Sequence, residues 1–344
     1  MLHRAVLKYG DVNHNQALFH YHQACAAEIL NHKIKSLGQL GPDQELFEDV
    51  SLFFFSQIQA SAYGAWRAHL NAAKTLLNLW GVETLMGNPG YEFQLCHLAL
   101  ADIFGAAMAP ASHITAEDVE QHKVYLRLLG RFKVDVCNTM VPIPEPIVRS
   151  VAAINISRAP KLPEVQCKQA EVGNPASTDA IMDSLRAFDP TVWALQRPRH
   201  TPSQATSWAL LATCFQAAAV LYLVRTSPTG TYKDAADLFY GRLTKCIREL
   251  YELRQEGGTL YKYILWPMVV CGVEAVVRND ERQMKSLCGL LEQTTMDLGT
   301  LSMREAAKFL DGLWLTSTKM DHASLSRVPL DWDTIFGRGP LFLM

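Results

Sequence analysis

Apolar residues return at three- and four-residue steps along most of this chain, the spacing that places them on one face of an α-helix. Thr115, three residues before Asp118, has the spacing of a helix N-cap with an acidic first turn. The helices predicted in this way cover residues 15–37, 43–60, 62–79, 91–108, 115–132, 148–157, 179–188, 203–226, 232–255, 259–278, 280–297 and 302–318.

Glycine and proline mark the breaks between these helices. Gly38 and the pair Gly41-Pro42 end the first one, and Gly81 supplies a left-handed cap for the third. Residues 158–178 are rich in proline and polar side chains, so we expect a flexible loop there. The last residues, 331–344, lack periodicity but are apolar, so we expect an irregular tail that packs back on the body.

No stretch of the chain repeats with the regular period that solenoid proteins show. We therefore predict an all-α fold, an irregular multi-helix bundle in which residues 1–344 form a single domain. Apolar residues make up 49% of the chain and charged residues 19%, which is enough apolar material for one large core.

The formal net charge of -2 provides no global attraction to a phosphate backbone, so we expect no direct contact with nucleic acid. The eight cysteines lie apart, without the two-to-four spacing of a zinc site, and we expect them to be reduced. We find neither a signal peptide nor a membrane span in the sequence. These observations together favour the cytosol or the nucleus, and we expect a cytoplasmic protein unless it is a transcription regulator, in which case we expect the nucleus.

Sequence motifs of common catalysts are also absent. The chain contains no Gly-x-Ser-x-Gly nucleophile elbow, no dinucleotide-binding Gly-x-Gly-x-x-Gly, no phosphate-binding loop and no aspartate-rich metal box. Any catalysis by this chain is therefore expected to need no cofactor and no metal.

Three titratable residues stand out as catalytic candidates. Asp102 and Glu274 lie in otherwise apolar helices, where an ionised carboxylate is costly to bury unless it is paired. Either carboxylate could be a proton donor, or it could form a salt bridge between helices, in the case of Asp102 to Arg67. His69 lies three residues after Trp66, on the same helical face, and could be catalytic or a hydrogen-bonded structural histidine.

Aromatic residues are frequent in the predicted core, and most such residues only fill space. A wide helical bundle can nevertheless leave an apolar cavity between its helices, with a few polar groups as anchors. The residues predicted to bind a substrate in such a cavity are Tyr63, Trp66, Tyr222 and Trp266, beside the three catalytic candidates.

Two stretches of the sequence, 61–81 and 261–291, resemble the C-terminal regulatory domain of fungal zinc-cluster transcription factors. The residues that carry this resemblance are Trp66, Arg67, His69, Gly81, Trp266, Pro267, Cys271, Gly272, Glu274 and the turn 280–282. It extends over about residues 12–318 and implies an all-helical regulatory domain. The family's DNA reader, an N-terminal six-cysteine zinc cluster with a basic linker, has no counterpart in this sequence, so we expect a stand-alone domain.

Two functions are consistent with these features. The first is a cofactor-free enzyme of fungal secondary metabolism, a cyclase of Diels-Alder or other pericyclic type, which folds a small apolar metabolite in an interhelical pocket. The second is a nuclear transcription regulator that senses a ligand or binds a partner, with a homodimer through a helical face as one arrangement. We prefer the enzyme, because a regulator without its own DNA contact needs an additional partner.

Overall fold

The computed structural model describes residues 12–36, 44–60, 66–86, 91–129, 142–160, 177–197, 202–227, 232–323 and 331–337. Within these ranges the chain forms helices and the turns between them, with no strand, which confirms the all-α prediction. The loop predicted at 158–178 lies for the most part outside the described residues, as does Tyr63.

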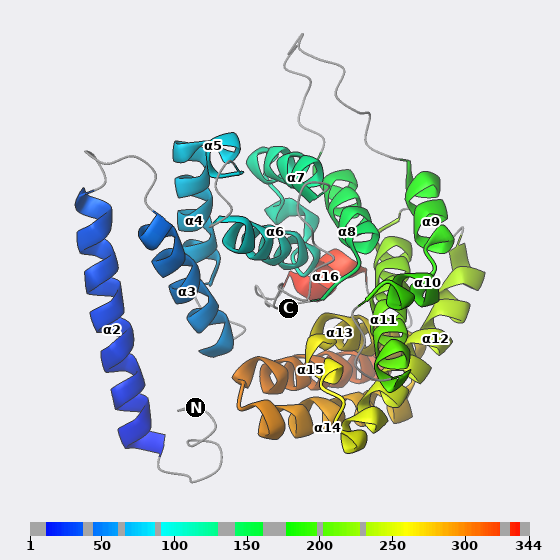
Figure 1. Ribbon diagram of the computed structural model, residues 1–344. Helices are drawn as coiled ribbons and strands as arrows, with labels where there is room; N and C mark the ends of the chain where they lie inside the picture. The colour runs from blue at the N-terminus through cyan, green and yellow to red at the C-terminus, as the bar shows by residue number, and fades with distance from the viewer. Residues whose placement is uncertain are drawn as a thin grey trace.

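The helices follow one another along the chain as Figure 1 shows. They are α2 (Val12–Ser36), α3 (Gln44–Ala60), α4 (Trp66–Trp80), α5 (Val82–Met86), α6 (Glu92–Ala107), α7 (Ala116–Leu129), α8 (Glu145–Arg158), α9 (Thr178–Ala187), α10 (Pro190–Leu195), α11 (Pro202–Thr226), α12 (Lys233–Glu252), α13 (Leu265–Arg278), α14 (Glu281–Leu298), α15 (Leu301–Ala323) and α16 (Trp332–Phe336). Short 3-10 turns, η3 (Ala111–His113), η5 (Leu253–Glu256) and η6 (Leu260–Tyr263), join some of them.

Local sequence explains where several of these helices begin and end. Gly81 and Gly299 have φ angles of 79° and 74°, the left-handed conformation that glycine adopts without strain, and they follow α4 and α14. The predicted cap of α7 is present, because the Thr115 hydroxyl accepts a hydrogen bond from the Asp118 amide at 3.2 Å.

One predicted helix and the predicted irregular tail differ from the structure. The helix expected at 259–278 is interrupted at Ile264, where η6 ends and α13 begins. Pro267 explains the break, since proline has no amide hydrogen and is tolerated only in the first turn of a helix. The tail expected to be irregular contains α16, whose first turn is capped by the Asp331 carboxylate accepting from the Thr334 amide at 2.7 Å.

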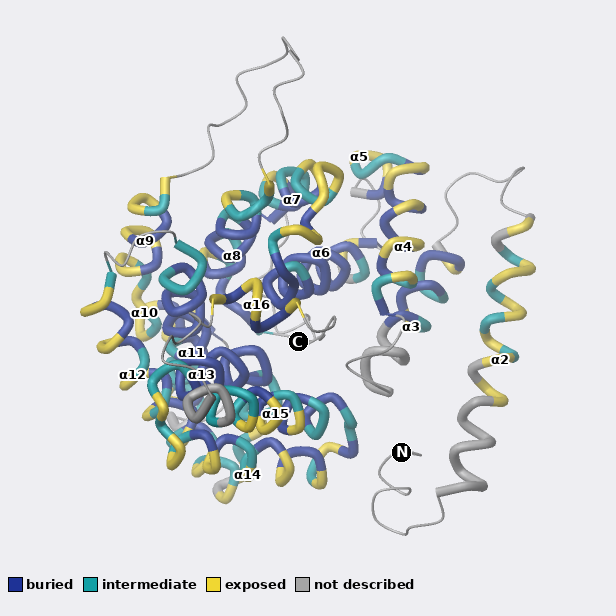
Figure 2. The backbone as a smooth tube through the Cα atoms, turned by 180° about the vertical axis from the view of Figure 1, so that it is seen from behind, coloured by how far each residue is buried: buried dark blue, intermediate teal, exposed yellow. Residues whose placement is uncertain are grey.

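The core lies where α11 and α13 cross the middle of the bundle, with α12, α14 and α15 on one side and α6 and α8 on the other (Figures 1 and 2). Residues 214–223 of α11 are all buried. Residues 204–226 are long and apolar enough to cross a membrane, with a mean hydropathy of 1.7, but 72% of the scored window is buried inside the protein. Such burial is that of a core helix.

Candidate functional site

A pocket of about 280 Å³ lies between α4, the C-terminal end of α6, the segment 109–115 and the start of α7. Its walls carry more polar than apolar side chains, and it opens to the surface. The residues that line it are Trp66, Arg67, Leu70, Asn71, Lys74, Thr75, Asp102, Gly105, Ala106, Ala109, His113, Ile114, Thr115, Glu117 and Asp118.

The sequence of the two facing helices explains why there is room for this pocket. Six of its residues come from α4 between positions 66 and 75, at spacings that keep them on one side of the helix. Opposite them lie the small residues Gly105 and Ala106 in the last turn of α6 and Ala109 just after it, which leave space that larger side chains would fill. The pocket therefore follows from small residues at one helix end.

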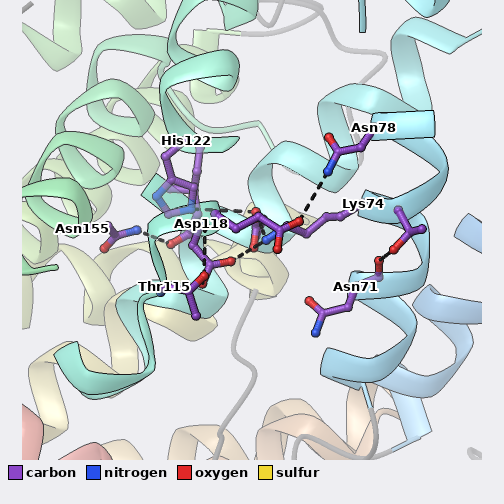
Figure 3. Close-up of polar contacts among 11 residues, drawn as sticks. Asn71, Lys74, Asn78, Thr115, Asp118, His122 and Asn155 are labelled. Carbon is purple, nitrogen blue, oxygen red and sulfur yellow. Dashed lines mark hydrogen bonds and ion pairs between the residues drawn. The ribbon is translucent and has the colours of Figure 1, made fainter. Parts of the chain in front are cut away.

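An ion cluster forms the polar wall of the pocket (Figure 3). The Lys74 ammonium is 2.5 Å from Asp118 Oδ1 and 3.1 Å from Asp102 Oδ2, and its side chain is only 5% exposed. Burial would lower the pKa of Lys74, but the charge of Asp102 and the hydrogen bond to Asp118 outweigh burial and raise it. Lys74 is thus a charged lysine that joins α4 to α6 and α7.

Asp118 belongs both to this cluster and to the cap of α7. Its Oδ2 accepts hydrogen bonds from the amide and the hydroxyl of Thr115, at 2.9 and 2.8 Å. Burial alone would raise the pKa of Asp118, but the bonds from Lys74 and Thr115 lower it below its usual 3.8. The carboxylate is held in one orientation from both sides.

Two buried residues of α7 lie behind Asp102. His122 is fully buried, and its Nε2 is 3.9 Å from Asp102 Oδ2, which is too long for a hydrogen bond. Burial lowers the pKa of His122, with the charge of Asp102 opposing it, so the ring is neutral at pH 7. Tyr125 is fully buried too, and burial raises its pKa well above 10.0.

Of the residues predicted for a site, Trp66 and Asp102 line the pocket. Asp102 forms an interhelical salt bridge, but with Lys74 rather than with the expected Arg67. His69 lies outside the lining; its ring meets the Phe53 ring edge-on at 4.9 Å, and burial lowers its pKa.

Glu274 lies elsewhere, in a buried ion-pair network on α13. Arg225 donates to it from Nε and Nη2, both at 2.7 Å, and Arg278 Nε donates at 2.6 Å. The Glu274 side chain is 1% exposed. It links α11 to α13 and lines no described pocket.

Tyr222 and Trp266 belong to the solid core. The Trp266 ring stacks on Phe215 with ring centroids 6.1 Å apart and meets Phe104 edge-on at 5.0 Å. Tyr222 donates a hydrogen bond to Asn155 Oδ1 at 2.6 Å. The structure therefore separates these two residues and Glu274 from the pocket at Trp66.

Helix α16 is hydrogen-bonded to residues 107–111, a segment that continues into the pocket wall at 109–115. Trp332 Nε1 donates to the Ala107 carbonyl at 2.8 Å, and Asp333 accepts from the Ala111 amide at 3.0 Å. Arg158 donates to the Ala109 carbonyl at 2.8 Å and to Asp333 at 2.7 Å. These bonds satisfy carbonyls that the end of α6 leaves open.

Lys74 and His122 were missed at the level of sequence. Lys74 follows Leu70 and Ala73 and precedes Leu77 on the apolar face of α4, and a lysine in such a position is a signal of a buried, paired cation. Nothing in the sequence distinguishes His122 from a surface histidine. Among the described residues there is no cluster of three or more side chains suited to a metal.

Comparison with known proteins decides the family. Residues 2–343 match the family described as the fungal specific transcription factor domain. This chain belongs to that family. A curated relative from Leptosphaeria maculans, the phomenoic acid biosynthesis cluster-specific transcriptional regulator, is 23% identical over 296 residues, which are 83% of this chain and 52% of the relative. The chain thus spans about half the length of that relative, and no solved structure matches it.

The preference for a cyclase was wrong. The family match over nearly the whole chain and the regulator named as a relative both indicate a transcription regulator. That preference relied on the absence of a DNA-binding motif, and the absence of catalytic motifs beside it is what a regulator would also show. The catalytic assignments of His69, Asp102 and Glu274 depended on that preference, and we do not retain them. The expected cytoplasmic location is not supported by the family or by the relative either.

Proposed function

We propose that this chain is the regulatory domain of a pathway-specific transcription regulator, acting in the nucleus on genes for a secondary metabolite. The family match over residues 2–343 carries this proposal. The relative that regulates a biosynthesis cluster supports the kind of target.

The same proposal assigns DNA contact to another segment or to a partner. A net charge of -2 gives the chain no overall attraction to DNA, and the part that the structure describes is a helical bundle closed around its own core. The pocket beside Lys74 supports a domain that responds to a small molecule.

Gene deletion followed by transcript profiling tests the regulatory role. We expect loss of the gene to lower or raise transcripts of a group of neighbouring biosynthetic genes together. A culture that loses a metabolite while all these transcripts stay at their normal levels would contradict regulation, because an enzyme deletion has that effect.

A pocket-filling substitution tests the response to a small molecule. Ala106 lines the pocket and is partly exposed, so Ala106→Leu places a larger side chain there. Ala68→Leu, at an exposed position of α4 outside the lining, is the matched control. We expect the ratio of cluster transcripts between producing and non-producing cultures to approach one in the first variant only. An unchanged ratio in both variants contradicts sensing through this pocket.

A further inference from the structure

Arg67 is the cation of the pocket whose hydrogen bonds are incomplete. Its Nε and Nη2 atoms are buried and have no acceptor among the described residues, although the side chain lines the pocket. The guanidinium lies over the Trp66 ring, 4.9 Å from the ring centre. A buried charged donor without an acceptor is costly, so such a group calls for an explanation.

Nε and Nη2, the two nitrogens without an acceptor, form the edge with which arginine holds a carboxylate. Within this protein, Arg225 uses the same pair, Nε and Nη2, to bind both oxygens of Glu274 at 2.7 Å. Arg67 presents an equivalent planar fork without a carboxylate to fill it. The acceptor that Arg67 lacks should therefore be planar and negatively charged, as a carboxylate is.

Two of the three carboxylates that line the pocket, those of Asp102 and Asp118, are already engaged by another cation, and the third, Glu117, accepts from Asn78 at 3.5 Å. Lys74 binds Asp102 at 3.1 Å and Asp118 at 2.5 Å, and Asp118 is held further by Thr115. Burial lowers the pKa of Arg67, while the charges of Asp118 and Asp102 oppose that shift without either carboxylate forming a hydrogen bond to its open edge. An incoming cation would compete with Lys74, whereas an incoming anion would supply the acceptor that the two Arg67 nitrogens lack.

We propose that the pocket binds a small organic acid whose carboxylate is held by Nε and Nη2 of Arg67. The proposal rests on the regulatory function above and names the class of its ligand. Because both nitrogens are covered in the structure, binding requires a rotation of the half-buried guanidinium toward the pocket.

The rest of the pocket fits the body of such an acid. Trp66, Leu70 and Ile114 provide apolar contact, and the Asn71 side chain provides hydrogen bonds for a hydroxyl or carbonyl group. The Thr75 hydroxyl, which donates to the Asn71 backbone carbonyl, can still accept a hydrogen bond. A pocket of about 280 Å³ limits the ligand to a small molecule.

Calorimetric titration of the full chain with matched acids and amides tests the proposal. The probes are phenylacetate, benzoate and hexanoate, each beside its own primary amide, which keeps the shape and removes the charge. We expect at least one acid to bind at least tenfold more tightly than its amide. Equal binding of acid and amide in every pair, or no binding at millimolar concentration, overturns the proposal.

Variants of Arg67 separate a ligand-binding role from a structural one. Arg67→Met keeps the stem beside Trp66, and Arg67→Lys keeps the charge but not the fork. We expect both to weaken binding of the acid at least tenfold, and Arg67→Met to unfold at the same or a higher temperature than the wild type. Arg127→Gln, at an exposed arginine of α7, is the control and should bind like the wild type.

Two results would assign Arg67 to the structure instead. One is a clear loss of thermal stability in Arg67→Met, and the other is undiminished acid binding by both variants. Transcript profiles distinguish this failure from failure of the proposed function, because a regulator of unknown ligand still changes its target transcripts when its gene is deleted.

Discussion

Replacement of Lys74 by methionine probes the ion cluster that holds α4, α6 and α7 together. The methionine keeps the length of the stem but leaves Asp102, whose side chain is 6% exposed, without its cation. Removing one partner of a buried ion pair costs about 3–5 kcal/mol, because the remaining charge stays buried. The Asp118 side chain is 23% exposed and keeps its hydrogen bonds from Thr115. Asp118 should therefore contribute less than Asp102 to the loss of stability. We expect a loss of about 3 kcal/mol in the free energy of unfolding at pH 7.

The loss should depend on pH in a defined direction. The pKa of Lys74 is raised in the folded chain, so its contribution is complete below the usual 10.5 and disappears as the pH rises through the folded value. The pKa of Asp118 is lowered, so its contribution is present above 3.8 and disappears as the pH falls through the folded value. In the variant, uptake of protons by the carboxylates should reduce the loss as the pH falls toward about 4.

Urea unfolding followed by tryptophan fluorescence measures these differences, and linear extrapolation gives the free energies. Lys123→Met is the matched control, because Lys123 pairs with Glu120 at 2.6 Å on the surface, where an ion pair contributes about 0–1 kcal/mol. If Lys74→Met loses no more stability than Lys123→Met, the buried cluster does not hold the three helices together. A loss independent of pH would contradict the assignment to buried charges.

Further substitutions test other buried groups. Trp332→Phe leaves the Ala107 carbonyl without its donor and should cost about 1–3 kcal/mol in urea unfolding; no loss would mean that water replaces the indole. His122→Gln should flatten the decline in stability between about pH 7 and pH 5, because a buried ring whose pKa is lowered resists the proton that the unfolded chain accepts; parallel profiles would contradict this. Glu274→Gln should cost about 3–5 kcal/mol in thermal unfolding, whereas Glu281→Gln, on an exposed ion pair, should stay near the wild type; equal losses would refute the buried network.

Periodicity was sufficient to predict the long helices, most of which have a face that must be buried. The exception is α2, in which none of the side chains that the structure describes is buried. Periodicity failed where a single residue decides the outcome. Pro267 starts a new helix within an unbroken apolar pattern, and α16 is too short to show a period. An Asp331 cap and packing against α6, far away in sequence, stabilise that last helix.

The site was less predictable than the fold because partners are chosen in three dimensions. The sequence indicated that Asp102 needs a cation, but Arg67 and Lys74 are both on α4, and only the packing of α4 against α6 and α7 selects Lys74. The aromatic residue Trp266 was expected in a cavity and instead fills the core, since ring stacking leaves no space beside it. Arg67 was expected to be the salt-bridge partner, but its Nε and Nη2 atoms have no acceptor among the described residues.

The attachment of α16 to the end of α6 has a consequence for the order in which the protein matures on the ribosome. The carbonyl of Ala107 is synthesised first, but its donor on Trp332 emerges more than two hundred residues later, together with Asp333, the counter-ion of Arg158. Until then the Ala107 carbonyl must bond to water, and the wall of the pocket beside it lacks the bonds that α16 provides. The pocket wall therefore gains the support of α16 only after residue 333 has emerged from the ribosome.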